Sequence, residues 1–85
     1  MEQPQQFAKE PIPVWAMQWT GENLQSIQEW CGVIGVIGGT TLEVYDKLHD
    51  SWIKVFLDQW ILQGTEGEFY AHDDALFRKN YRKVN

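Results

Sequence analysis

The segment DQWILQGTEGEFY, residues 58–70, determines how the middle of this chain folds. Apolar and aromatic residues stand before and after residues 64–67, and glycine occupies both ends of that short segment. Such a pattern is typical of two strands joined by a hairpin turn. A Gly-x-x-Gly loop between helices can also clamp a nucleic-acid backbone. Here strands flank the loop, and Glu66 and Glu68 would repel phosphate. The segment therefore predicts a hairpin in which Gly64 and Gly67 both adopt positive φ.

Outward from this hairpin, the apolar pattern predicts short strands at 13–19, 40–46, 52–57, 60–63, 68–71 and 81–84. Residues 20–32 predict a helix of about three turns, with Thr20 or Asn23 at its start and Gly32 at its end. Residues 72–80 predict a second, short helix. The predicted fold class is α+β: a single domain over residues 11–85 with a bent antiparallel sheet of about five to six short strands, one three-turn helix and one short C-terminal helix. Residues 1–10 are polar, and we expect a flexible tail.

The size and composition of the chain fit a small globular domain. Its 85 residues make one domain with a thin core, which five tryptophans help to fill. The tryptophans expected in the core are Trp19, Trp30, Trp52 and Trp60. One cysteine, Cys31, can form neither an internal disulfide nor a metal-ligand pattern, which suits a reducing cytosol. No signal segment and no run of membrane-spanning length is found, so we expect no membrane contact.

Charge is distributed unevenly along the sequence. The formal net charge is −5, which disfavours general binding to nucleic acid. All the acidic residues precede a basic C-terminal end, which comprises Arg78, Lys79, Arg82 and Lys83. A weak, salt-sensitive nucleic-acid contact through this basic end, with Tyr81 available for stacking, is an alternative function. A solvated surface is the simpler interpretation.

The glycine-rich segment 32–39 predicts an exposed apolar arm. A phosphate-binding loop needs a helix after it and lysine beside it, and the sequence offers neither. The arm instead exposes four aliphatic side chains, which are Val33, Ile34, Val36 and Ile37. Exposed apolar surface often marks a protein contact, so we expect partner docking or homo-oligomer formation through this segment. Trp15, on the predicted edge strand after Pro13, is a further candidate contact.

Two histidine–aspartate groups occur in the sequence, at His49-Asp50 and His72-Asp73-Asp74. Histidine and carboxylate together can bind a metal or transfer a proton. One group lies in a predicted turn and the other at a predicted helix start, which are places that Asp favours for local reasons. No nucleophile with a matching base is evident. We therefore expect no enzymatic activity, no cofactor and no metal.

Three stretches resemble a family of small proteins encoded by bacteriophages and prophages, mostly of unknown function. They read PIPVWAMQWTGEN (11–23), LEVYDKLHDSWIKV (42–55) and WILQGTEGEFYAHDDALFRKNY (60–81), against family patterns PIPVxAxQWTGxN and WIxxGxxGEFYxxxxxxFxxxY. The chain departs from the family at predicted surface positions: Trp15, Asp58-Gln59, Ala71-His72, Arg78 and Arg82. The resemblance implies a shared fold and a phage origin. It carries over no catalytic residue.

The function expected from the sequence is that of a phage-encoded binding protein without enzymatic activity. It would contact a host protein in the host cell cytoplasm, as an inhibitor of a defence or nucleic-acid enzyme. Six acidic residues near the predicted hairpin ends could imitate a phosphate backbone: Glu43, Asp46, Asp50, Asp58, Glu66 and Glu68. The alternatives are the nucleic-acid contact described above and a homo-oligomeric structural or assembly protein.

Overall fold

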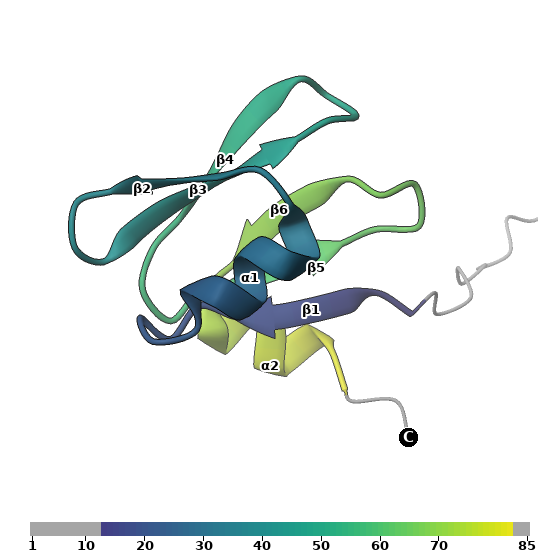
Figure 1. Ribbon diagram of the computed structural model, residues 1–85. Coiled ribbons are helices and arrows are strands. Elements are labelled where there is room, and N and C mark those ends of the chain that lie inside the picture. Colours follow the sequence, from purple (N-terminus) through teal and green to yellow (C-terminus); the bar gives the residue numbers. More distant parts are fainter. Residues whose placement is uncertain (1–12, 83–85) are drawn as a thin grey trace, which may run out of the picture.

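The computed structural model describes residues 13–82, which fold into a small α+β unit (Figure 1). In chain order its elements are β1 (Trp15–Gln18), α1 (Leu24–Cys31), β2 (Ile34–Ile37), β3 (Thr41–Asp46), β4 (Ser51–Val55), β5 (Trp60–Gln63), β6 (Phe69–His72) and α2 (Asp74–Asn80). The expected α+β class is confirmed. Tyr81 and Arg82 do not form the predicted final strand, and the rest of that strand lies outside the described residues, as does the predicted tail.

The strands form two three-stranded antiparallel sheets, β1–β5–β6 and β2–β3–β4, so the prediction of one bent sheet is wrong. The chain passes from one sheet to the other at the turn between β4 and β5, where Asp58 has φ 71°. The Trp19 N–H donates to the carbonyl of Gln59, and the Asp58 N–H donates to the carbonyl of Trp19. These two bonds tie the turn to the end of β1, so the following strand pairs with β1 rather than with β4.

The core lies between the facing sides of the two sheets. Leu42, Val44 and Val55 from β2–β3–β4 form one buried cluster with Ile61 and Phe69 from β1–β5–β6. The alternation of buried and less buried residues along β3 is typical of a strand with one face on a core. Helix α1 completes this cluster with one fully buried side chain, that of Ile27.

Helix α1 is shorter than predicted, and it starts after Asn23, one of the two residues predicted at its start. It has eight residues, about two turns, and the side chain of Asn23 makes no capping bond. That side chain instead accepts from the backbone N–H and hydroxyl of Thr20 and donates to the carbonyl of Gln18. These bonds fix the loop between β1 and α1. Gly32 ends the helix at φ 86°, as predicted.

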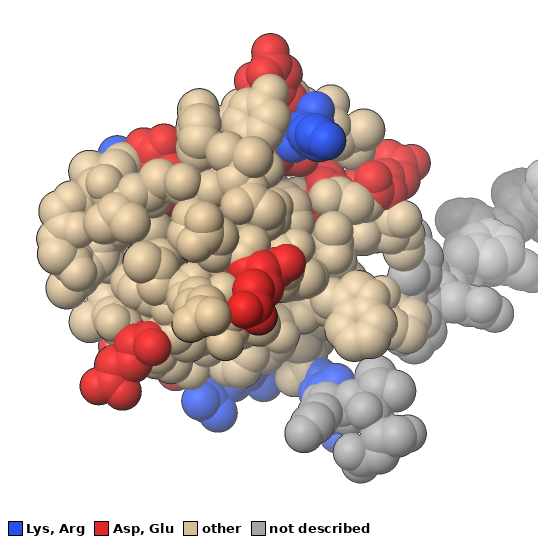
Figure 2. Space-filling model, viewed as in Figure 1, with Lys and Arg blue, Asp and Glu red and all other residues tan. Residues whose placement is uncertain are grey.

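The glycine-rich segment, where an exposed arm but no strand is predicted, contains strand β2. Residues of β2 pair with β3, from Ile34 opposite Val44 to Ile37 opposite Thr41. The aliphatic residues between the glycines are β-branched and favour extended backbone, which explains the strand. In Figure 2 the end of the molecule formed by the β2–β3 hairpin carries no charged side chains, in agreement with the absence of charged residues from 30 to 42.

The hairpin of residues 58–70 forms as predicted, with one correction. Gln63 pairs with Phe69, and the Gly64 N–H donates to the carbonyl of Glu68. Gly67 has φ 89°, but Gly64 is not among the residues with positive φ. A side chain at position 64 would instead displace the Glu68 carboxylate, which is the far end of a flexible side chain.

Candidate protein-binding surface

The side of the β2–β3–β4 sheet that faces away from the core is exposed, and we call it the open face. Its apolar members are Val33, Ile37, Tyr45, Trp52 and Phe56, and its middle row is Gly35, Glu43 and Lys54. Strand register places the residues of β2, β3 and β4 together, because cross-strand partners share a face. Phe56 directly follows β4 and is exposed, in line with the alternation of Trp52 and Lys54. Val33 lies opposite Tyr45 on the same face, because its carbonyl accepts the Tyr45 N–H. The side chains on β4 alternate accordingly: Trp52 and Lys54 are exposed, and Val55 is buried.

Trp52 lies at the centre of the aromatic row of the open face. It is 50% exposed, so the prediction that it belongs to the core is wrong. Its ring lies 5.2 Å from that of Tyr45 at an angle of 57°. Phe56 is 53% exposed, just beyond the end of β4. These exposed aromatic side chains provide surface for a partner, and the rings of Tyr45 and Trp52 are ordered before binding because they pack on each other.

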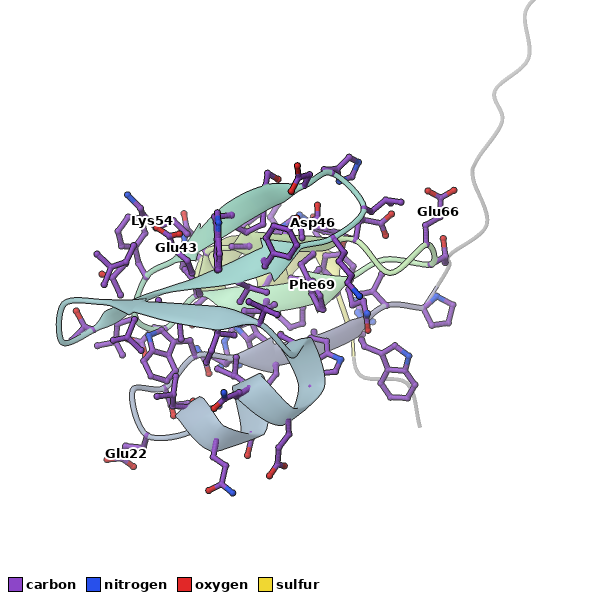
Figure 3. The ribbon with its side chains drawn as sticks, turned by 45° about the horizontal axis from the view of Figure 1, so that its top comes forward. Glu22, Glu43, Asp46, Lys54, Glu66 and Phe69 are labelled. Carbon is purple, nitrogen blue, oxygen red and sulfur yellow. The ribbon has the colours of Figure 1, made fainter. Side chains whose placement is uncertain are left out.

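Two opposite charges lie in the middle of the open face. Glu43 and Lys54 stand directly opposite each other on β3 and β4, and Figure 3 shows them side by side. Opposite charges in such a cross-strand position are favourable neighbours. They also make the charge distribution of the open face asymmetric, because the negative charge lies on β3 and the positive charge on β4.

Asp46 does not contribute to an exposed acidic surface, which corrects the expectation for this residue. It is 1% exposed at the end of β3, and its Oδ2 lies 2.6 Å from Nδ1 of His49. This hydrogen bond holds the pKa of the Asp46 carboxyl below its ordinary value of 3.8, while desolvation acts in the opposite direction. The pair fixes the β3–β4 turn, which was predicted at this place.

The other predicted acidic residues are distributed over separate parts of the surface (Figure 2). Asp50 accepts a hydrogen bond from the hydroxyl of Tyr45. Asp58 lies in the β4–β5 turn, and Glu66 is exposed in the β5–β6 turn. Glu68 is half-buried beside Gly64 in that same turn. These residues therefore occupy three different turns, while Glu43 lies on the open face.

The basic end is partly engaged within the fold. Arg78 on α2 forms an ion pair with Asp74, with Nε 2.8 Å from Oδ1. Lys79 and Arg82 are exposed, and Lys83 lies outside the described residues.

Trp15 lies at a second apolar place, on the edge strand β1. It is 75% exposed, as its position after Pro13 predicted. Together with Ala16, Met17 and Trp30 it lines a shallow hollow of about 230 Å³. The hollow lies beside α1, away from the open face.

Helix α2 covers the outer face of the other sheet, β1–β5–β6, and we call this the covered face. The ring of Phe77 stacks on Trp60 at 4.0 Å and an angle of 12°, and on Tyr81 at 5.2 Å. Leu62 belongs to the same face by register with Tyr70 and is fully buried. Burial and the neighbouring Tyr81 raise the pKa of Tyr70 above its ordinary value. The covered face is thus a second, smaller core.

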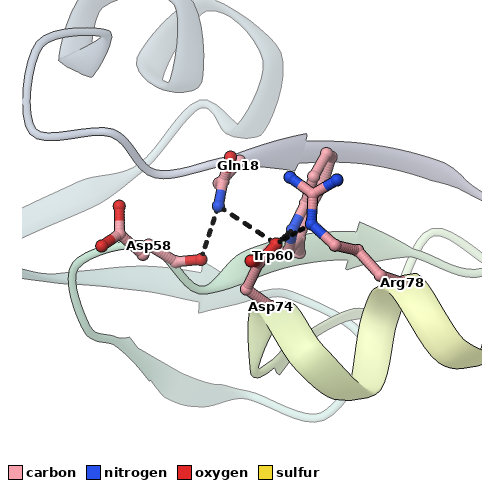
Figure 4. Close-up of polar contacts among 5 residues, drawn as sticks. All are labelled: Gln18, Asp58, Trp60, Asp74 and Arg78. Carbon is pink, nitrogen blue, oxygen red and sulfur yellow. Dashed lines mark hydrogen bonds and ion pairs between the residues drawn. The ribbon is translucent and has the colours of Figure 1, made fainter.

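A network around Asp74 fixes α2 in place (Figure 4). The indole N–H of Trp60 donates to Asp74 Oδ1 at 2.8 Å, and the side-chain amide of Gln18 donates to the same oxygen at 3.4 Å. The Trp60 bond, and after it the bond and charge of Arg78, hold the pKa of Asp74 below 3.8, against some desolvation. Next to it, Asp73 accepts from the side chain of Gln59. Both aspartates predicted at this helix start therefore help to dock the helix.

Most of the candidate catalytic and metal-binding groups make contacts within the fold. His72 lies on the covered face near the rings of Tyr70 and Tyr81, and the hydrogen bonds of Asp73 and Asp74 go to other residues. Burial raises the pKa of Cys31 to about 12, so the thiol is protonated at neutral pH and is a poor nucleophile. Within residues 13–82, no three His, Cys, Asp or Glu side chains are grouped to hold a metal ion. Neither helix in this part of the chain is long and apolar enough to cross a membrane.

The sequence predicts the exposed apolar arm, except that Ile34 packs against the core, and it does not predict the aromatic part of the open face. The alternation of Trp52, Lys54 and Phe56 with Ile53 and Val55 was visible in the sequence. Both sets contain large apolar residues, so the pattern did not indicate which one faces the core.

Comparison with protein-family models, with curated proteins and with solved structures gave no match to this chain. What the protein does is therefore inferred from its own geometry and from the motif resemblance.

Proposed function

We propose that this chain is a non-enzymatic binding protein that contacts another protein through the open face. The observation that carries the proposal is the exposed aromatic row around Trp52, on a sheet face whose large side chains stay in solvent. Trp, Tyr and Phe are enriched at the centres of protein interfaces, where a few such anchors supply most of the affinity. Tyr45 and Trp52 already pack on each other. Binding therefore orders fewer side chains, which lowers its entropic cost.

The partner we propose is a bacterial host protein in the host cell cytoplasm, and the action is inhibition of a defence or nucleic-acid enzyme. The motif resemblance to phage-encoded proteins supports this origin. Glu43 and Lys54 within the open face would select the orientation of the partner, because opposite charges must be matched across an interface.

The apolar open face supports contact better than the acidic residues do. Asp46 is buried, and the remaining acidic residues are dispersed over several turns. The positive charge that the basic end can offer to a partner is likewise reduced, since Arg78 is paired with Asp74. Trp52 and Phe56, in contrast, are already exposed and available for contact.

The experiment compares variants of the full chain in affinity capture from a bacterial host lysate, followed by calorimetry with the purified partner. The test variants are Trp52→Ser and Phe56→Ser, and the controls are Trp15→Ser and Leu48→Ser, which change apolar residues elsewhere that are at least half exposed. We expect the test variants to weaken binding at least tenfold, as removal of an interface anchor does. The controls should bind like the parent. A partner that binds both test variants normally but is lost on Glu66→Lys would contradict the proposal and favour the acidic residues.

A further inference from the structure

Among residues 13–82, strand β2 leaves one edge of its sheet unpaired. It contacts β3 on one side, and in the order β2–β3–β4 its other side is the end of the sheet. The Tyr45 N–H donates to the carbonyl of Val33, so these opposed residues are a hydrogen-bonded pair. Hydrogen-bonded and non-hydrogen-bonded pairs alternate along an antiparallel ladder. The N–H and C=O groups of Ile34 and Val36 therefore point away from β3, toward the free edge.

Although β2 is short, this edge lacks three other features that usually keep sheet edges from pairing. Edge strands are commonly protected by charged side chains, proline or a bulge. No charged residue and no proline occurs from residue 30 to residue 42. The ladder from Ile34 to Ile37 pairs residue for residue with β3 and contains no bulge. Four extended residues are thus available for a new strand partner.

Val36 provides a second, independent observation. Its register with Leu42 and Val55 directs it to the core side of the sheet, where both of those residues are fully buried. Val36 itself is 62% exposed, because no further strand lies beside it. A strand added at this edge would cover it.

We propose that β2 pairs antiparallel with β2 of a second copy of this chain, across a twofold axis at Gly35. Ile34 of one copy then stands opposite Val36 of the other, and each such pair exchanges two backbone hydrogen bonds. The result is a continuous six-stranded sheet. Antiparallel pairing of one strand with its own copy is self-complementary, as a twofold interface requires.

Two properties of the molecule favour a second copy over another partner. The chain has a net charge of −5, and two copies repel each other least where both are uncharged, which is along this segment. Gly35 would face Gly35 of the other copy in a non-hydrogen-bonded pair, where side chains come closest. Space is open at this position, since the nearest atom to an added Cβ is a Trp52 ring carbon at 4.0 Å.

The dimer goes beyond the proposed function and does not depend on it. Gly35 belongs to the open face, so the pairing would join two open faces into one larger surface. The contact between the two β2 strands involves only four residues of each copy. We therefore expect a weak, concentration-dependent dimer, as is usual for small interfaces.

The test is sedimentation equilibrium of the full chain from micromolar to millimolar concentration. We expect a monomer–dimer equilibrium in the parent. Val36→Pro removes an N–H that faces the free edge and leaves the β2–β3 bonds in place. Val36→Asp places two carboxylates in the new interface. Each variant should raise the dissociation constant at least tenfold, whereas Leu48→Asp, with the same charge change on an exposed turn, should dimerise like the parent.

A second measurement keeps the test informative if Val36→Pro does not fold. In the parent, the amide protons of Ile34 and Val36 should exchange more slowly at high than at low protein concentration. A parent that stays monomeric throughout, or a dimer unaffected by both Val36 variants, would overturn the proposal. Trp52→Ser separates the two proposals, since it should weaken partner binding at least tenfold and leave the backbone pairing of the dimer intact.

Discussion

The outer faces of the two sheets differ in what the chain places on them. Both carry aromatic rings: Trp60 and Tyr70 on the covered face, Tyr45 and Trp52 on the open face. On the covered face, α2 adds Phe77 in a stacked arrangement and closes the surface. On the open face no helix of residues 13–82 covers the rings, and Trp52 remains half exposed. Figure 1 shows α2 on the side of the molecule away from β2–β3–β4.

The difference shows that similar aromatic content can serve stability in one place and recognition in another. Burial of an aromatic side chain stabilises the fold. An aromatic side chain held in solvent contributes little to folding and is free to contribute to binding. The predictions that follow test whether the two faces differ in this way.

The largest expected effect is on the covered face, at Leu62. Leu62→Ala would leave a cavity beside α2, and the free energy of unfolding should fall by about 2–5 kcal/mol, as for other fully buried leucines. Urea denaturation followed by tryptophan fluorescence measures this loss. Val33→Ala on the open face is the control, and its loss should stay below about 1 kcal/mol because the side chain is exposed. Equal losses in the two variants would mean that the faces are not distinct.

An intermediate effect is expected at Phe77, which covers that face. Phe77→Ala removes both stacked contacts, with Trp60 and with Tyr81, and should lower the free energy of unfolding by about 1–3 kcal/mol, since the side chain is half-buried. Near-ultraviolet circular dichroism should also lose signal from the ordered Trp60. Leu76→Ala, at the exposed neighbouring position on the same helix, should change stability by less than about 0.5 kcal/mol. If Leu76→Ala lowered the free energy of unfolding more than Phe77→Ala, α2 would pack on the sheet through a different helix face.

The smallest expected effect concerns the pH dependence of α2 docking. The pKa of Asp74 is lower in the folded protein than its ordinary value of 3.8. Its stabilising contribution is therefore fully present above the ordinary carboxyl pKa, and is lost as the pH falls through the folded value. Asp74→Asn should be less stable than the parent near neutral pH, and this difference should shrink from about pH 5 to pH 2.

Denaturation midpoints across that pH range give the measurement for Asp74. Arg78→Gln provides the matched variant, because it removes the ion pair and keeps the Trp60 hydrogen bond. It should lie between the parent and Asp74→Asn. A difference that grows in acid would show that the sign of the Asp74 contribution is wrong.

The local structure was largely predictable from the sequence, and the pairing of strands was not. The β5–β6 hairpin, Gly32 at the end of α1 and the charge order of α2 follow from residues close in sequence. The division into two sheets depends on hydrogen bonds between Trp19 and the 58–59 turn, which are distant in sequence. No local pattern encodes such a contact.

The open face was only half predictable for the same reason. Val33 and Ile37 were expected to be exposed because they lie in a glycine-rich segment. Trp52 was expected in the core because large aromatic residues usually are buried. Its exposure follows from α2 lying on the other sheet, which is a tertiary arrangement.

Hydroxyl-radical footprinting of the full chain tests most directly whether one outer face is covered and the other open. It compares residues of the same chemical type, Trp52 with Trp60 and Phe56 with Phe77, so intrinsic reactivity cancels within each pair. We predict that Trp52 and Phe56 are oxidised several-fold faster than their counterparts. Equal rates within both pairs, or faster oxidation of Trp60 and Phe77, would contradict the account.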